Sequence, residues 1–183
     1  MPAANTVALF SHPASPLTTP CSIQVAAAMT AGGGLSLSYR IRCLPEAIRI
    51  PAPLPSGPAE GLWQNTCCEA FVTEVGEGYR EFNFSPSGQW AAYRFTSYRE
   101  RDAAFAADAA PQISFNLLAD GFELHATLPA ALLPSGKAPQ LGLTTVIEAA
   151  AGNKSYWALA HCATQPDFHL RQSFALTLNQ PAP

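Results

Sequence analysis

The sequence predicts an all-β protein, an antiparallel sandwich of two sheets. Short segments alternate apolar and polar residues with a period of two, turn-forming residues separate these segments, and no segment keeps a long helical period. With 183 residues the chain is long enough to bury a core and short enough for one domain. We expect a single domain over residues 1–183, with residues 1–20 as an extended, Pro-rich lead-in on its outside.

The first hairpin is predicted directly after the lead-in. Ser22–Met29 begins with strand-like alternation and Leu35–Arg42 alternates for eight residues, while three glycines at 32–34 supply the turn. Residues 51–61 contain four prolines and two glycines, so a surface loop is expected there.

Three consecutive antiparallel strands are predicted in the middle of the chain, at Glu69–Thr73, Tyr79–Phe84 and Gln89–Phe95. Glycine-containing turns at 76–78 and 85–88 connect them. The tripeptide Pro-Ser-Gly occurs at 55, 86 and 134, each time between apolar segments. Proline presets the first turn position and glycine tolerates the last, so each copy predicts a turn.

The remaining chain adds one short helical expectation and more strands. Residues 99–110 are rich in Arg, Asp and Ala and are expected to carry a helical turn or two, which Pro111 ends. The further predicted strands are Gln112–Leu118, Gly121–Leu128, Leu141–Glu148, Ser155–Leu159 and Phe174–Leu178.

Charge and composition exclude several classes of partner. The formal net charge is −3 and the ten basic residues are dispersed, so nucleic acid is not expected. No apolar run approaches the roughly 18 residues that span a bilayer, so no membrane segment is expected. No Lys or Arg precedes Arg40, unlike a secretory signal, and five cysteines show no disulfide spacing. Cys67 and Cys68 are expected as core thiols, and unpaired thiols favour a cytoplasmic location.

Polar and aromatic side chains alternate along the two central strands. Glu81 and Asn83 share one side of their strand, and Trp90 and Arg94 share one side of the next. If these sides coincide, carboxylate, amide and guanidinium groups lie beside an indole, which suits the hydroxyls and the flat face of a sugar. The alternative is a surface Glu–Arg ladder with the tryptophans in the core, and both remain open.

A second polar block covers residues 155–171. His161, Cys162, Asp167 and His169 admit a metal site, but their spacing lacks the close pairs typical of zinc. A hydrogen bond between Asp167 and His169 that braces a loop is the favoured interpretation.

Catalytic signatures are sparse. The sequence has no Gly-x-Ser-x-Gly elbow and no glycine-rich phosphate loop before a helix. Glu69, Glu81 and Glu148 could supply an acid and a base for a sugar derivative, so an enzyme remains an alternative.

The central block LWQNTCCEAFV, with YREFNFSPSGQWAAYRF and SYWALAH, resembles bacterial DOMON-like proteins, which are related to family 9 carbohydrate-binding modules. The resemblance runs from about Leu35 to Leu178. It implies an immunoglobulin-like β-sandwich that binds sugar or haem in a pocket on one sheet. The positions that match the outline of the sugar-binding relatives are Trp63, Glu69, Phe71, Tyr79, Phe82, Pro86 and Gly88.

The resemblance leaves the cofactor undecided between calcium, haem and none. The related modules often carry an acidic residue just before the Glu69 strand, and this chain has Thr66, Cys67 and Cys68 there, so calcium is not assigned. The haem-binding relatives use Met and His, but Met29 is expected to be buried. A pair drawn from His125, His161 and His169 is the haem alternative.

We therefore expect a non-catalytic domain that binds a small ligand, a carbohydrate or a similar polyhydroxylated molecule. The alternatives are an enzyme, a haem-binding domain and a module that docks another protein; the oligomeric state is left open. No catalytic or metal-ligating residue is assigned. The expected ligand-binding residues are Trp63, Glu69, Glu81, Asn83, Trp90, Arg94, Glu148, Trp157, His161 and His169.

Overall fold

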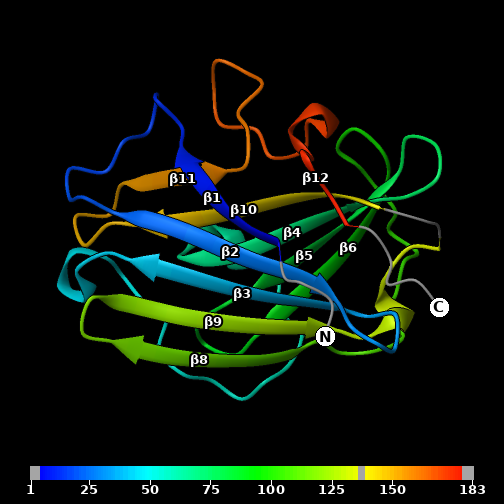
Figure 1. Ribbon diagram of the computed structural model, residues 1–183, viewed down its shortest axis with the longest axis horizontal. Coiled ribbons are helices and arrows are strands. Elements are labelled where there is room, and N and C mark those ends of the chain that lie inside the picture. The colour runs from blue at the N-terminus through cyan, green and yellow to red at the C-terminus, as the bar shows by residue number, and fades with distance from the viewer. Residues whose placement is uncertain (1–4, 136–138, 179–183) are drawn as a thin grey trace.

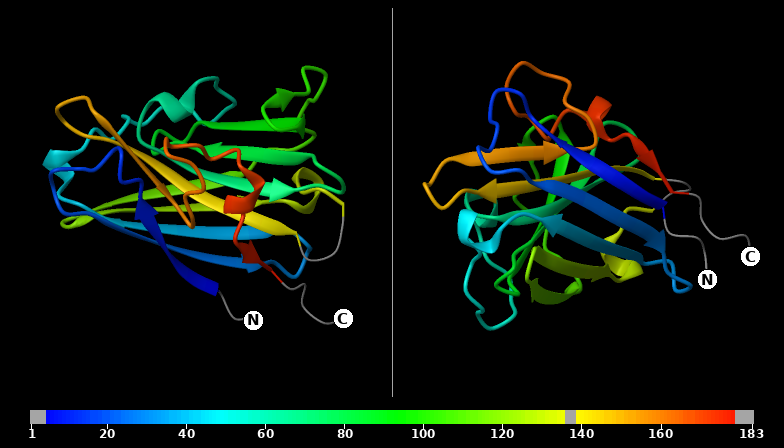
Figure 2. Two further views of the ribbon diagram at one scale, coloured as in Figure 1. Left: turned by 90° about the horizontal axis from the view of Figure 1, so that it is seen from above. Right: turned by 60° about the vertical axis from the view of Figure 1, so that its left-hand side comes forward.

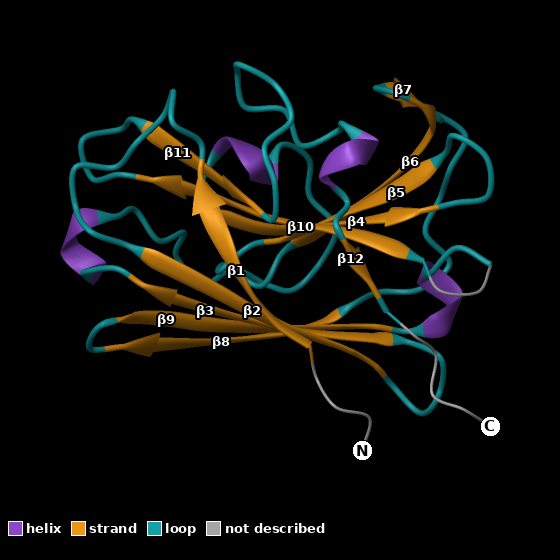
Figure 3. Cartoon of the chain, turned by 45° about the horizontal axis from the view of Figure 1, so that its top comes forward, coloured by secondary structure: helices purple, strands orange, loops and turns teal. Residues whose placement is uncertain are grey.

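The computed structural model describes residues 5–135 and 139–178 and has two layers of antiparallel strands (Figures 1 and 3). The first layer has the order β1-β2-β3-β9-β8 and the second has the order β7-β6-β5-β4-β10-β11, with β12 beside β10. This confirms the predicted antiparallel β-sandwich. The strands of the first layer are β1 (Asn5–Ser11), β2 (Ser22–Met29), β3 (Leu35–Arg42), β8 (Gln112–Leu118) and β9 (Gly121–Leu128). Those of the second are β4 (Cys67–Thr73), β5 (Tyr79–Phe84), β6 (Trp90–Ser97), β7 (Glu100–Arg101), β10 (Gln140–Glu148), β11 (Lys154–Ala158) and β12 (Leu176–Thr177).

Three sequence expectations are corrected. The lead-in contains β1, a strand without proline; β1 pairs with β2 and, at its end, with β11, and the views of Figure 2 show its ribbon beside that of β2. Residues 99–110 form no helix and contain β7 instead. The last strand is only the two residues of β12, which the short helix η4 (Arg171–Ser173) precedes. The third Pro-Ser-Gly turn ends outside the described residues.

The main core lies between the two layers. The alternate side chains of β2, β3 and β9 face those of β4, β5 and β10, and all are nearly inaccessible to water. The hydroxyl of Tyr39 crosses this core and donates a hydrogen bond to the carbonyl oxygen of Glu69 at 2.7 Å. Because a buried hydroxyl needs a partner, this bond fixes β4 against the first layer.

The outer face of the second layer is also covered. A second apolar cluster there includes Phe71 on β4, Tyr93 on β6, and Phe168 and Phe174 from the chain after β11. At Gly142 an added Cβ would lie 2.6 Å from the Phe174 ring, so glycine allows this segment to approach β10 closely. The C-terminal segment thereby forms a roof over the outer face.

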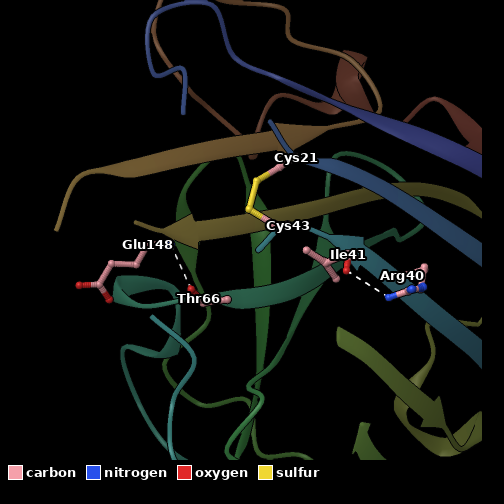
Figure 4. The surroundings of a disulfide bond; sticks show 6 residues. All are labelled: Cys21, Arg40, Ile41, Cys43, Thr66 and Glu148. Atoms are coloured by element: carbon pink, nitrogen blue, oxygen red, sulfur yellow. Dashed lines mark hydrogen bonds between the residues drawn. A yellow bond between two sulfur atoms is a disulfide. The ribbon is translucent and has the colours of Figure 1, made fainter. Parts of the chain in front are cut away.

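A disulfide joins Cys21, just before β2, to Cys43, just after β3 (Figure 4). The expectation of unpaired cysteines is wrong for this pair, because β2 and β3 pair in a register that brings Ser22 opposite Arg42. Sequence spacing cannot reveal that proximity. Cys67 and Cys68 are buried thiols as expected, and Cys162 is an exposed thiol.

The other short helices are η1 (Pro45–Ala47), η2 (Leu62–Gln64) and η3 (Ala130–Leu132). Within residues 5–135 and 139–178, no helix has the length and apolar character needed to cross a membrane.

Candidate functional site

A cavity of about 630 Å³ opens on the outer face of the second layer. Strands β4, β5, β6, β10 and β11 form its floor, and the loop after β11 forms part of its wall. The residues that line it are Glu60, Trp63, Glu69, Phe71, Glu81, Tyr93, Phe95, Arg99, Arg101, Val146, Tyr156, Gln165, Pro166, Phe168 and His169.

Two buried carboxyl groups lie on the floor. Glu69 on β4 pairs with Asn83 on β5, so Glu81 occupies the next position on the same face. Glu69 is 2% exposed and Glu81 is 5% exposed. Glu69 Oε2 accepts a hydrogen bond from the Thr144 hydroxyl at 3.0 Å, and Glu81 Oε1 accepts one from the Asn83 amide at 2.8 Å. Each carboxyl group thus has one oxygen that accepts a hydrogen bond from a neutral donor, and both residues line the cavity.

Burial favours the protonated form of both acids. It raises the pKa of Glu69 well above its usual value, and the nearby Glu81 adds to the rise. Burial also raises the pKa of Glu81 to about 7, although the Asn83 amide and the guanidinium groups of Arg99 and Arg101 partly offset it. The pair therefore holds at least one proton near neutral pH.

His169 lies beside Glu81 as a neutral side chain. Desolvation, with the charge of Arg99, lowers the pKa of His169 to about 4. The Tyr79 hydroxyl lies 2.8 Å from His169 Nδ1 and accepts a hydrogen bond from the Arg99 amide, so its own proton points to Nδ1. His169 Nε2 then carries the proton and faces Glu81 Oε2 at 3.8 Å.

The guanidinium groups at the rim are paired with acids. Arg101 donates to Glu60 at 2.9 Å and lies 4.2 Å over the Tyr93 ring. Arg99 donates to Asp167 at 2.9 Å. Arg99 has φ of 56°, an unusual value for a residue other than glycine, and this conformation brings its amide to Tyr79. The rim therefore contributes little unbalanced charge.

Aromatic rings supply the apolar surface. Trp63 on η2 is 48% exposed and Tyr156 is half-buried, and both line the cavity. The Tyr156 ring lies 5.9 Å from that of Phe168. Flat rings beside convergent polar groups are typical of a small-ligand site.

Four of the expected ligand-binding residues come together in the cavity, namely Trp63, Glu69, Glu81 and His169. Asn83 is fully buried behind Glu81, where its amide orients that carboxyl group. A direct contact of these residues with a ligand stays a prediction.

Trp90 and Arg94 lie on the opposite face of the sheet, so the single Glu–Asn–Arg–Trp face expected from the sequence is wrong. The five-residue connection 85–89 pairs Phe84 with Trp90 and Glu81 with Tyr93. A shift of one residue in the pairing register moves every side chain of a strand to the other face of the sheet. The face that Trp90 and Arg94 occupy therefore depends on the register. Arg94 instead donates to Glu74 and Asp102.

Three further expected residues lie outside the cavity. Trp157 is buried in the main core, because its neighbour Tyr156 takes the outward position on β11. Glu148 pairs with Arg49 at 2.8 Å and lines a separate hollow of about 400 Å³. His161 Nε2 lies 2.8 Å from the Phe10 carbonyl oxygen, and its ring meets that of His12 edge-on.

The loop interpretation of the second block is confirmed in a modified form. The backbone amide of His169, rather than its ring, donates to Asp167 Oδ1 at 3.0 Å. His161 and His169 lie in different surroundings, and His125 lies on β9 in the first layer, 3.9 Å from Glu123.

Sequence reasoning missed most of the rim and wall. Tyr93 and Phe95 alternate with Trp90 and Arg94 along β6, so the observed register places them on the Glu81 face in place of those two residues. Glu60 comes from a loop, Arg99 from the β6–β7 turn and Arg101 from the two-residue strand β7, where no periodic pattern indicates which residues converge. Tyr156 lies within the second polar block, residues 155–171, but was not singled out there.

No protein-family model and no curated protein matches the sequence. The fold is similar to that of a "putative carbohydrate-binding protein" from Bacteroides uniformis ATCC 8492, with a TM-score of 0.69 and 17% identity over 96% of this chain and 86% of that one. It is also similar to a family 9 carbohydrate-binding module from Caldicellulosiruptor kristjanssonii in complexes with glucose and with cellotriose. Both have a TM-score of 0.56, with 10% and 11% identity over 93% of this chain and 82% and 80% of those chains. The chain therefore has the β-sandwich fold of these proteins, which agrees with the resemblance to family 9 modules.

Proposed function

We propose that the outer-face cavity binds a carbohydrate without catalysis. The observation that carries the proposal is the combination, in one open cavity, of exposed aromatic surface and buried, convergent polar groups. The fold neighbours that carry glucose and cellotriose support it. Membership of the DOMON-like proteins is part of this proposal.

Each part of the cavity has a separate role in this proposal. Trp63 and Tyr156 provide flat surfaces for the apolar face of a pyranose ring. Glu69 and Glu81 accept hydrogen bonds from hydroxyl groups on the floor, and His169 Nε2 donates one. The Arg99–Asp167 and Arg101–Glu60 pairs hold the rim in place.

Calorimetric titration against neutral monosaccharides and oligosaccharides tests the proposal. We expect at least one of them to bind, and the Trp63→Ala variant to bind it more weakly. The matched control is Trp90→Phe, which keeps an aromatic ring on the opposite face and should leave the affinity unchanged. Absence of heat with every sugar at millimolar concentration would refute the proposal.

A second candidate is hydrolysis of a sugar derivative. It is favoured by the two carboxyl groups in the same cavity, because a glycosidase uses one protonated carboxyl group with a raised pKa as acid beside a second, ionised one as base or nucleophile. Glu148 has no part in it, because it lies at the separate hollow. Turnover of chromogenic aryl glycosides that Glu81→Gln abolishes would replace the binding proposal by this one.

A further inference from the structure

The floor and the rim of the cavity differ in how their charges are balanced. Both guanidinium groups at the rim already have a carboxylate partner, at 2.9 Å in each case. The floor carboxyls have only the neutral donors Thr144 and Asn83. His169 faces Glu81 but is neutral near pH 7, so it supplies no counter-charge. Among the described residues no Lys or Arg forms an ion pair with either floor acid.

Once the floor acids are ionised, their free oxygens act only as hydrogen-bond acceptors. Glu69 Oε1 and Glu81 Oε2 accept no hydrogen bond from a side chain or amide of residues 5–135 and 139–178. A group with several protons, a positive charge and no lone pair complements two such oxygens better than a hydroxyl does. A primary ammonium has these properties.

We propose that the sugar recognised by this cavity carries a primary amine, and that its ammonium group docks between Glu69 and Glu81. The inference rests on the carbohydrate-binding proposal and narrows it to amino sugars and glucosamine-terminated chains. Aromatic rings at Trp63 and Tyr156 would hold the ring carbons, while the floor holds the charged nitrogen.

Docking of the ammonium displaces a proton from the acid pair. The empty pair is largely protonated at pH 6, and an adjacent cation stabilises its ionised form, so the carboxyl group loses a proton to the buffer while the ammonium keeps its own. We expect release of roughly one proton per bound amine at pH 6. The titratable or charged groups that lie near the pair on the packed elements are Tyr39, Cys67, Cys68, Tyr79, Tyr93, Arg99, Arg101 and His169.

The test compares D-glucosamine, D-glucose and N-acetyl-D-glucosamine by calorimetry at pH 6 in two buffers with different ionisation enthalpies. The N-acetyl sugar keeps the nitrogen but removes the charge. We expect glucosamine to bind about tenfold or more tightly than either, with a heat that depends on the buffer. A glucosamine oligosaccharide in a further arm distinguishes a free sugar from a chain end, which would bind more tightly than the monomer.

Glu81→Gln and Glu69→Gln should each reduce the preference for the amine to less than threefold, while Glu123→Gln on the first layer should retain it. Both Gln variants are tested so that the inference can still be refuted if one of them fails to fold. Equal affinity for glucose and glucosamine would overturn this inference and leave the carbohydrate proposal standing. An amine preference that survives both Gln variants would also overturn it. Binding of none of the sugars would overturn both proposals.

Discussion

Replacement of Glu81 by Gln should change how stability depends on pH. The pKa of Glu81 is raised from 4.5 to about 7 in the folded protein, so the unfolded chain releases this proton at lower pH than the folded one. The stabilising contribution of the proton is complete below pH 4.5 and is lost as pH rises through 7. A shift of about 2.5 units, at about 1.4 kcal/mol per unit, corresponds to about 3 kcal/mol.

The pH dependence of the free energy of unfolding of the wild-type protein alone would not reveal this effect. His169 has a pKa lowered from 6.5 to about 4, so it contributes stability above pH 6.5 that is lost as pH falls towards 4. The two trends oppose each other between pH 4.5 and 6.5. The difference between variant and wild type cancels most of the His169 contribution, because the burial and the Arg99 charge that lower the His169 pKa are the same in both proteins.

Urea unfolding followed by tryptophan fluorescence between pH 4.5 and 8 measures this difference. We expect Glu81→Gln to match the wild type near pH 4.5 and to exceed its free energy of unfolding by up to about 3 kcal/mol at pH 8. The exposed control Glu123→Gln should show no such trend. A difference that stays constant, or that grows as pH falls, would refute the assignment of a buried proton to this acid.

Three other predictions concern the aromatic residues, the disulfide and the register. Trp63→Ala should weaken sugar binding about tenfold without altering urea unfolding. Trp157→Ala should lower the free energy of unfolding by about 4 kcal/mol because it leaves a cavity in the core, and the reverse pattern would contradict the two placements. Alkylation of the unfolded chain without reductant should modify three thiols, and reduction should lower the free energy of unfolding by about 3 kcal/mol by opening the Cys21–Cys43 loop; five modified thiols would show that the bond is absent. Arg94→Met should leave sugar affinity unchanged and have little effect on stability, because Arg94 lies partly exposed on the face opposite the cavity; a loss of affinity would support the register expected from the sequence.

The strands with clean alternation could be predicted from the sequence. The segments β2, β3, β8 and β9 have the expected bounds, and the apolar side of β9 faces the core as its alternation indicates. Strand β1 was not predicted because the prolines that follow it dominate the composition of residues 1–20. A helix was wrongly expected in residues 99–110 because their composition favours one. Hydrogen bonds from Arg99 to Asp167 and from Arg101 to Glu60 hold the start of this segment in another conformation.

The site could be predicted only in part, because alternation fixes the two sides of a strand but not which side adjoins which. The acids Glu69 and Glu81 were found because their strands pair directly. Arg94 was assigned to the wrong face because the register of the β5–β6 hairpin cannot be read from alternation. Phe168 and His169 were hard to place because they reach the cavity from a loop. The Cys21–Cys43 disulfide was missed because strand register, not sequence spacing, brings the two thiols together, and the cytoplasmic location stays a prediction.

The most direct test of a carbohydrate site in the outer-face cavity is a crystal structure of the protein soaked with the sugar that binds most tightly in solution. We expect density for one sugar ring against Trp63, with a polar substituent within hydrogen-bond distance of Glu69 or Glu81. Density confined to the hollow beside Glu148, with the outer-face cavity empty, would contradict it.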